Sequence, residues 1–209
     1  QPAERRGITT LFSGIKHPRR IAFFVITSAL ISLGAGAVSP LMNVVFHEGH
    51  LHADEAQIGI MFALGELGLA AATILVPLLA VRMLKVDAIA ITRLLSLTFG
   101  LGMGLLPLVM GEGALLVVLV GTSYVGRTAI FRMRRPLDDA FNMEVLEPRE
   151  RATSTGIEIA AGGAMSAIAI FVGSRLVDSG DYTTPFLLMA MGFLASTVIY
   201  WRVFRPLEV

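Results

Sequence analysis

Long apolar stretches alternate with short polar ones along almost the whole chain. Crossing about 30 Å of hydrocarbon takes roughly 20 helical residues. Six stretches reach that length: 21–46, 57–81, 86–109, 114–140, 152–172 and 184–203. Since backbone groups in lipid must be paired within their own segment, each should be an α-helix. The pattern predicts an all-α integral membrane fold: a polar entry loop at residues 1–20, then one bundle of six transmembrane helices over residues 21–209.

Composition supports a membrane class and excludes several chemistries. Hydrophobic residues make up 55% of the chain and charged residues only 16%, whereas soluble domains carry about 25% charge. The principal partner should therefore be the lipid bilayer. The absence of cysteine excludes disulfides and thiolate chemistry, and a net charge of +1 gives no reason to expect a nucleic-acid partner.

The basic residues predict the orientation, because loops retained in the cytoplasm are rich in Lys and Arg. Of the 17 Lys and Arg residues, two lie inside spans (Arg93 and Arg127) and Arg175 lies alone on one side. The other 14 fall on the opposite side: Arg5, Arg6, Lys16, Arg19, Arg20, Arg82, Lys85, Arg132, Arg134, Arg135, Arg149, Arg151, Arg202 and Arg205. We expect a plasma or bacterial inner membrane, with both termini in the cytoplasm.

A short pattern occurs in both halves of the chain. The second span opens with Gly59, Ile60, Ala63 and Gly65, and the fifth opens with Gly156, Ile157, Ala160 and Gly162. These two spans run in opposite directions. The pattern therefore predicts an inverted 3+3 repeat, an arrangement common in secondary transporters.

The polar segments between the spans carry a resemblance to a known family. They are Pro40-Leu-Met-Asn43, Ala56-Gln-Ile-Gly59, Pro77-Leu-Leu-Ala-Val-Arg82, Met143-Glu-Val-Leu-Glu-Pro-Arg-Glu-Arg-Ala152, and Leu176-Val-Asp-Ser-Gly-Asp-Tyr182 with Phe186. In their order and spacing they resemble the C-terminal half of a major facilitator superfamily transporter. The resemblance implies a twelve-helix protein whose N-terminal six-helix half is missing here. One departure is Val81, which stands where the family's cytoplasmic gating motif has Asp, and it weakens a gating role for Arg82.

Polar residues form a narrow stripe on each of two spans. The first span carries Ser28, Ser32, Gly36, Ser39 and Asn43 within an arc of about 80°, and the fourth carries Ser123, Arg127, Arg134 and Asp138 within about 60°. Such stripes either pack against other helices or line a wet cavity. The resemblance implies that the first of these spans lines the central pathway. We predict substrate contacts from Ser32, Ser39, Asn43, Ser123 and Arg127.

Four charged residues are predicted to lie within the membrane: Glu66, Arg93, Arg127 and Glu158. Placing Arg near the bilayer centre costs from about 2.5 to 17 kcal/mol, depending on the reference state. Counting residues puts Arg127 and Glu158 at similar depth. Two Arg and two Glu could therefore neutralise one another as a structural charge network. Alternatively, Glu66 or Glu158 couples transport to an ion.

The function predicted from these patterns is that of a secondary active transporter that moves a small solute by alternating access, driven by an ion gradient. A non-transporting six-span scaffold is the alternative. We find no ATP-binding or intramembrane-protease motif, so neither an enzyme nor a cofactor is expected. The outer-loop histidines (His47, His50, His52) match no standard metal spacing and are expected to be solvated. The polar start without an initiator Met is typical of a piece of a longer protein.

Overall fold

A computed structural model describes residues 16–49 and 51–208, and every regular element among them is helical. The elements are α2 (Pro18–Gly36), the 3-10 helix η1 (Ser39–Leu41), α3 (Met42–Glu48), α4 (Glu55–Arg82), α5 (Lys85–Val109), α6 (Ala114–Val145), α7 (Pro148–Asp178) and α8 (Thr184–Glu208). Residues 1–15 of the predicted entry loop and His50 of the outer histidine cluster lie outside the described residues.

Six segments are long and apolar enough to cross a membrane, as the hydropathy pattern predicted. They are Pro18–Glu48, Glu55–Pro77, Lys85–Val109, Ala114–Val145, Pro148–Asp178 and Thr184–Leu207. The fourth and fifth of them are long helices that run past their predicted ends: α6 has 32 residues and α7 has 31. At 1.5 Å per residue each is more than about 45 Å long. The junction between α6 and α7 therefore projects beyond a hydrocarbon layer of about 30 Å.

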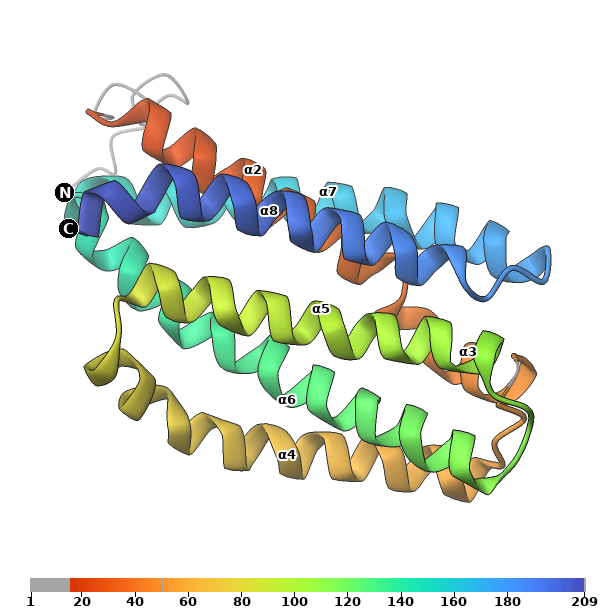
Figure 1. Cartoon of the computed structure of the whole chain (residues 1–209). Coiled ribbons are helices and arrows are strands. Elements are labelled where there is room, and N and C mark those ends of the chain that lie inside the picture. Colours follow the sequence, from red (N-terminus) through yellow and green to blue (C-terminus); the bar gives the residue numbers. More distant parts are fainter. Residues whose placement is uncertain (1–15, 50, 209) are drawn as a thin grey trace, which may run out of the picture.

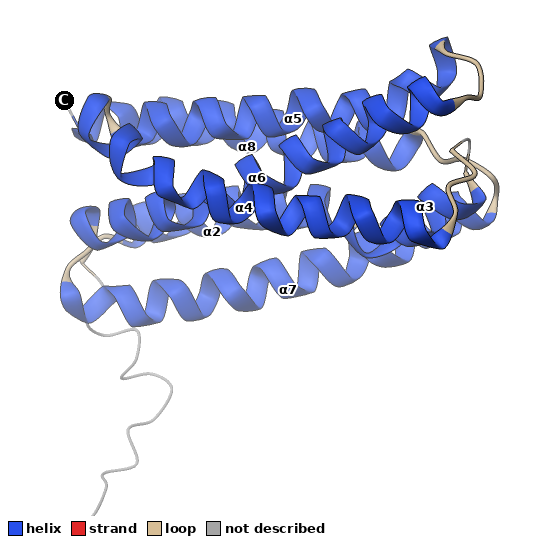
Figure 2. Ribbon diagram, turned by 90° about the horizontal axis from the view of Figure 1, so that it is seen from below, coloured by secondary structure: helices blue, strands red, loops and turns tan. Residues whose placement is uncertain are grey.

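The helices pack in the spatial order α7, α2, α8, α5, α6, α4, each against the next. Figure 1 shows α7, α2 and α8 on one side of the bundle and α5, α6 and α4 on the other. Helix α2 begins and α8 ends at the same end of the bundle (Figure 1). The axes of the long helices are roughly aligned in the turned view (Figure 2). Among helices consecutive in the chain, only α5 and α6 share a long interface.

Helices α2 and α8 pack closely against each other. A Cβ atom added to Gly192 would lie 2.7 Å from the carbonyl oxygen of Leu30, and one added to Gly34 would lie 2.9 Å from that of Met189. Only glycine lets two helix backbones approach this closely. Near the start of α2, the rings of Phe24 and Phe204 stack with centroids 4.3 Å apart. We call the interfaces among α2, α5 and α8 the closed side of the bundle.

The first span is one apolar segment but not one continuous helix. Helix α2 ends at Gly36, and the 3-10 turn Ser39–Leu41 separates it from α3. Pro40 has no backbone N–H to donate and its ring disfavours a continuing α-helix, which accounts for the break. The residues after Gly36 therefore leave the regular 100° progression on which the predicted polar stripe was counted.

The start of α2 is tied to the start of α7 through one carboxylate. Glu150 accepts hydrogen bonds from the backbone N–H groups of Lys16 (2.5 Å) and His17 (2.9 Å). It also belongs to a capping box with Glu147 at the first turn of α7, an arrangement that satisfies unpaired amide groups at a helix start. Glu150 thus fixes how α2 and α7 enter the bundle side by side.

Candidate functional site

A groove of about 1090 Å³ runs between α2 and α6, with α4 and α7 at its margins. Its polar lining consists of Ser32, Ser39, Tyr124, Arg127, Thr128, Arg132, Arg134, Arg135, Asp139 and Ser166. No described residue of α5 or α8 lines it, so the groove lies away from the closed side. Polar and charged residues within membrane-length helices are costly where they face lipid, so this polar groove points to a role other than lipid contact.

Arg127 lies in the wall of this groove with almost no counter-charge. The side chain is 4% exposed, and its Nη2 donates a 2.9 Å hydrogen bond to the Ser39 hydroxyl. The guanidinium carbon lies 5.8 Å from the centre of the Phe131 ring. Its Nε has no hydrogen-bond partner, and no carboxylate of the described residues lies within ion-pair distance. Arg127 is therefore a buried cation satisfied by one neutral hydroxyl and one aromatic ring.

The other arginines of the groove differ in their pairing. Arg132 forms an ion pair with Glu66 of α4 at 2.8 Å, and Arg134 pairs with Asp138 one turn further along α6 at 3.0 Å. Arg135 is exposed and makes no ion pair or hydrogen bond with any other described residue. Two of the four guanidinium groups in the groove are thus paired with neighbouring carboxylates and two are not.

The predicted pathway residues divide into two groups. Ser32, Ser39 and Arg127 line the groove together. Asn43 is exposed on α3 and does not line it, because the 3-10 turn rotates α3 away from the stripe on α2. Ser123 is also outside the lining: its hydroxyl donates to the Leu119 carbonyl at 2.8 Å, and it packs against α5 beside Gly102.

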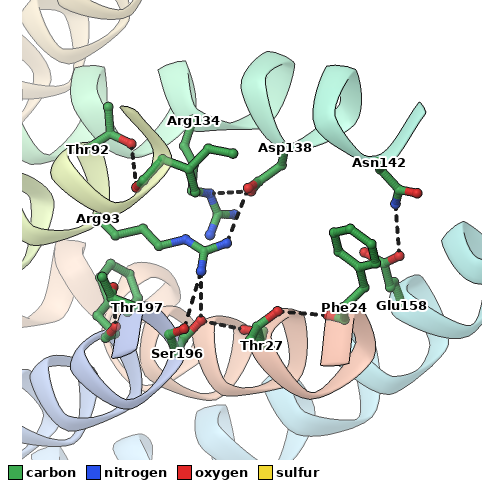
Figure 3. Close-up of polar contacts among 12 residues, drawn as sticks. Phe24, Thr27, Thr92, Arg93, Arg134, Asp138, Asn142, Glu158, Ser196 and Thr197 are labelled. Carbon is green, nitrogen blue, oxygen red and sulfur yellow. Dashed lines mark hydrogen bonds and ion pairs between the residues drawn. The ribbon is translucent and has the colours of Figure 1, made fainter. Parts of the chain in front are cut away.

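Next to the groove, a buried polar cluster joins four helices (Figure 3), and Arg134 and Asp139 line both the groove and the small cavity of this cluster. Arg93 of α5 is 3% exposed; its Nη2 lies 3.2 Å from Asp138 Oδ1 and its Nη1 lies 3.2 Å from Ser196 Oγ. The Ser196 hydroxyl in turn donates to the backbone carbonyl of Thr27 at 2.9 Å. The guanidinium also lies over the Tyr200 ring, 4.2 Å from its centre. This cluster connects α2, α5 and α8 of the closed side with α6.

Glu158 of α7 is held by neutral groups. Its carboxylate accepts hydrogen bonds from Asn142 Nδ2 (3.1 Å) and the Ser154 hydroxyl (2.8 Å), and no described cation lies within ion-pair distance. It shares a small cavity of about 50 Å³ with Arg93, Asp138 and Asn142. Figure 3 shows Asn142 and Glu158 beside this cluster.

The predicted network among Glu66, Arg93, Arg127 and Glu158 is wrong, because each of the four has other partners or none. The error comes from depth. Glu158 bonds Asn142, which lies 15 residues beyond Arg127 on α6, or about 22 Å along the helix axis. Because α6 and α7 both project past the hydrocarbon layer, counting from the ends of the apolar stretches placed Glu158 too deep.

Several residues of these two polar regions were not identified as partners from the sequence. Ser196 gave a weak signal, since Ser196-Thr197 is a polar pair within an apolar span. Asp138 was placed on the arginine stripe but not recognised as the partner of Arg93. Asn142 and Arg135 gave no distinguishing signal, because polar residues at a projecting helix end are ordinary.

Comparison with known proteins does not assign the chain to a family. No family model, curated protein or solved structure gives a significant match. Any function must therefore be argued from the groove and the polar cluster themselves.

Proposed function

We propose that this chain is one six-helix half of a secondary active transporter that moves a small solute across a cell membrane by alternating access. The observation that carries the proposal is the groove between α2 and α6, with buried Arg127 in its wall. A scaffold has no need to maintain a cation at this position, where burial without a counter-ion is unfavourable. A pathway that admits water and solute gives that cation a role.

The helix packing supports the inverted repeat that transporters of this kind use. Helix α2 packs on α7 and α8 as α6 packs on α4 and α5, while α5 packs on α8. Exchanging α2 with α6, α4 with α7 and α5 with α8 leaves this pattern unchanged. The repeated glycines follow the same exchange: a Cβ on Gly65 of α4 would lie 3.0 Å from Tyr124 of α6, and one on Gly162 of α7 would lie 2.8 Å from Ser32 of α2.

A second bundle would complete the pathway. The groove is walled by α2 and α6 with α4 and α7 at its margins, all from one side. In the twelve-helix arrangement that the sequence resembles, a second six-helix half would face this groove and close it. The groove thereby becomes a central cavity that opens alternately to the two sides as the halves rock about it.

Energy would come from an ion gradient, with Glu158 as the coupling residue. Its carboxylate has no cation partner among the described residues, so taking up a proton would break no ion pair. Glu66, the other candidate, is already paired with Arg132. A Glu158→Gln variant should carry solute down its gradient but lose accumulation driven by a pH gradient.

The orientation follows from the basic residues, and both termini are proposed to be cytoplasmic. The protein has no cysteine, so single cysteines can be introduced without background. Cysteines at Glu112 and Asp181 should react with impermeant reagents from outside, whereas cysteines at Lys85 and Arg149 should react only in inside-out vesicles. The reverse labelling would overturn this orientation.

The test of alternating access compares the two ends of the groove region. Asn43→Cys lies toward one end, on α3, and Asp139→Cys toward the other, on α6. In vesicles, an imposed pH or sodium gradient should raise labelling at one position and lower it at the other. Unchanged labelling at both positions, together with no uptake from a broad panel of labelled solutes, would reject the transporter in favour of a static scaffold.

A further inference from the structure

The charges of the groove do not balance. Arg132 pairs with Glu66, and Arg134 pairs with Asp138, which it shares with Arg93. Arg127 and Arg135 have no carboxylate within ion-pair distance among the described residues. The unpaired carboxylate in the lining, Asp139, is exposed and lies one turn beyond Arg135, 12 residues from Arg127. Near Arg127 the groove is therefore positive.

Arg127 also keeps hydrogen-bonding capacity that the protein does not use. A guanidinium carries five N–H donors in a planar fork. One bond goes from Nη2 to Ser39, and the buried Nε has no partner. Ser39 is itself exposed and lines the groove, so its hydroxyl lies within reach of an incoming ligand. A carboxylate or phosphate can accept two parallel bonds from such a fork.

We infer that the groove binds a solute with a carboxylate or phosphate group, and that this anionic group pairs with Arg127 beside Ser39. The inference rests on the proposed transport function and names the class of its substrate. A cationic solute would find no free carboxylate near Arg127 and would be repelled by it. Among the described residues, Arg93, Arg132 and Arg134 each have a carboxylate partner, whereas Arg127 has none. An anionic solute would supply the missing counter-charge.

The local charge can be measured without knowing the substrate. A cysteine at Ser39 is placed directly beside Arg127, and its reaction rates with a negatively charged (sulfonatoethyl) and a positively charged (trimethylammonioethyl) methanethiosulfonate are compared, each normalised to a free thiol. The negative reagent should be favoured, and Arg127→Gln should lower the ratio by about 10-fold, as expected for one unit charge a few ångströms away. Arg132→Gln is the matched control and should change the ratio less than 2-fold.

Binding is tested by protection of the same cysteine. Benzoate and glycerol 3-phosphate represent the two anionic groups, choline the cations and glucose the neutral solutes. At millimolar concentration one of the two anions should slow labelling severalfold with Arg127 present and have no effect in Arg127→Lys, which keeps the charge but loses the planar fork. Liposomes with and without phosphatidylglycerol separate a free solute from a lipid headgroup: protection by the lipid alone assigns the anion site to the membrane.

The outcomes separate this inference from the proposed function. A ratio unchanged by Arg127→Gln, or protection by choline rather than by either anion, overturns the anion site even where solute transport occurs. The opposite outcome is also distinguishable. If the ratio changes as expected and an anion protects the cysteine, but labelling at the two ends of the groove region never alternates, the anion site is supported and the transport function is rejected. Should Arg127→Gln fail to fold, Arg127→Lys still tests the anion site, because it keeps the charge and should nevertheless lose protection by the anion.

Discussion

Arg93 and Arg127 are both arginines within membrane-length helices and are almost equally buried, at 3% and 4% exposure. Their surroundings differ completely. Arg93 meets a carboxylate of α6 and a hydroxyl and an aromatic ring of α8, whereas Arg127 has one exposed hydroxyl and an aromatic ring of its own helix. Burial alone therefore does not separate a structural cation from a binding one; the partners do.

The comparison assigns different tasks to the two sides of the bundle. In the Arg93 cluster, Arg93 and Ser196 each form polar contacts with residues of other helices. In the groove, Arg132 pairs with Glu66 of α4, but Arg127 has a single hydrogen bond, to the Ser39 hydroxyl, and Arg135 has no ion pair or hydrogen bond to another described residue. Removing a residue on the closed side should lower stability, and removing its counterpart in the groove should chiefly alter ligand handling.

The largest expected effect on stability is that of Arg93→Ala. The substitution leaves Asp138 with Arg134 as its remaining cation and strips Ser196 of its charged partner, and breaking a buried pair typically costs about 3–5 kcal/mol. The measurement is unfolding in detergent, followed by fluorescence-detected size exclusion. Arg127→Ala is the paired variant and should cost less than about 1 kcal/mol. Equal losses in the two variants would erase the distinction between the two arginines.

The two serines that bond these arginines sharpen the same contrast. Ser196 is fully buried and bridges Arg93 to the Thr27 carbonyl, so Ser196→Ala should cost about 1.5–3 kcal/mol, the range for hydrogen bonds to charged groups. Ser39 is exposed and water can replace it, so Ser39→Ala should lie within about 0.5 kcal/mol of the parent. A larger loss of stability for Ser39→Ala than for Ser196→Ala would mean that the groove, and not the closed side, stabilises the fold.

Backbone contact on the closed side gives a third comparison. Gly192→Ala brings a methyl group against the Leu30 carbonyl, and overpacking of this kind costs about 1–3 kcal/mol. Gly156→Ala is the matched control, because nothing lies within 4 Å of its added Cβ and Ala is the better helix former. Thermal midpoints should fall for Gly192→Ala and hold or rise for Gly156→Ala. Similar midpoints would mean that α2 and α8 are less closely packed than described.

The smallest loss among the substitutions expected to destabilise the protein is in the outer loop, which serves as a reference outside both regions. Asp181 accepts hydrogen bonds from the N–H groups of Thr183 (3.0 Å) and Thr184 (2.9 Å), and the hydrogen bonds from Thr184 lower the pKa of its carboxyl. Asp181→Ala should cost about 1 kcal/mol at neutral pH.

The pH dependence of this contribution has a definite sign. A carboxyl whose folded pKa is lowered contributes stability above its ordinary pKa and loses it as the pH falls through the lowered value. The difference between parent and Asp181→Ala should therefore shrink in strong acid, measured by unfolding at neutral and acidic pH. Asp178→Ala, which removes no hydrogen bond or ion pair to any described residue, is the control and should show no such change.

The sequence predicted the spans because hydropathy and backbone pairing in lipid act residue by residue along one segment. It also placed Ser32, Ser39 and Arg127 in one polar region, which the groove contains. The partners of the charged residues could not be obtained in the same way. Pairing Arg93 with Asp138 requires knowing that α5 lies next to α6 and how each is rotated, and residue counting supplies depth alone.

The depth estimated by counting residues was also wrong where helices extend past the hydrocarbon layer. Glu158 was counted from the end of an apolar stretch, but α7 begins at Pro148, and the carboxylate lies level with Asn142. Asn43 failed for another reason: the irregular turn at Pro40 ends the helical periodicity that linked it to Ser32. Both errors arise at helix ends, where the regular geometry behind the prediction stops.

The spatial order of the helices has a consequence for biosynthesis. Helix α8 leaves the ribosome after the other described helices, yet it supplies an interface to both α2 and α5. The chain from Gly36 to Thr184 is about 150 residues, roughly 7–30 s of synthesis at 5–20 residues per second. Throughout that interval α2 resides in the bilayer or its insertion machinery without α8, and Ser196 cannot yet reach the Thr27 carbonyl. A nascent chain truncated before α8 should therefore be a substrate for membrane quality control.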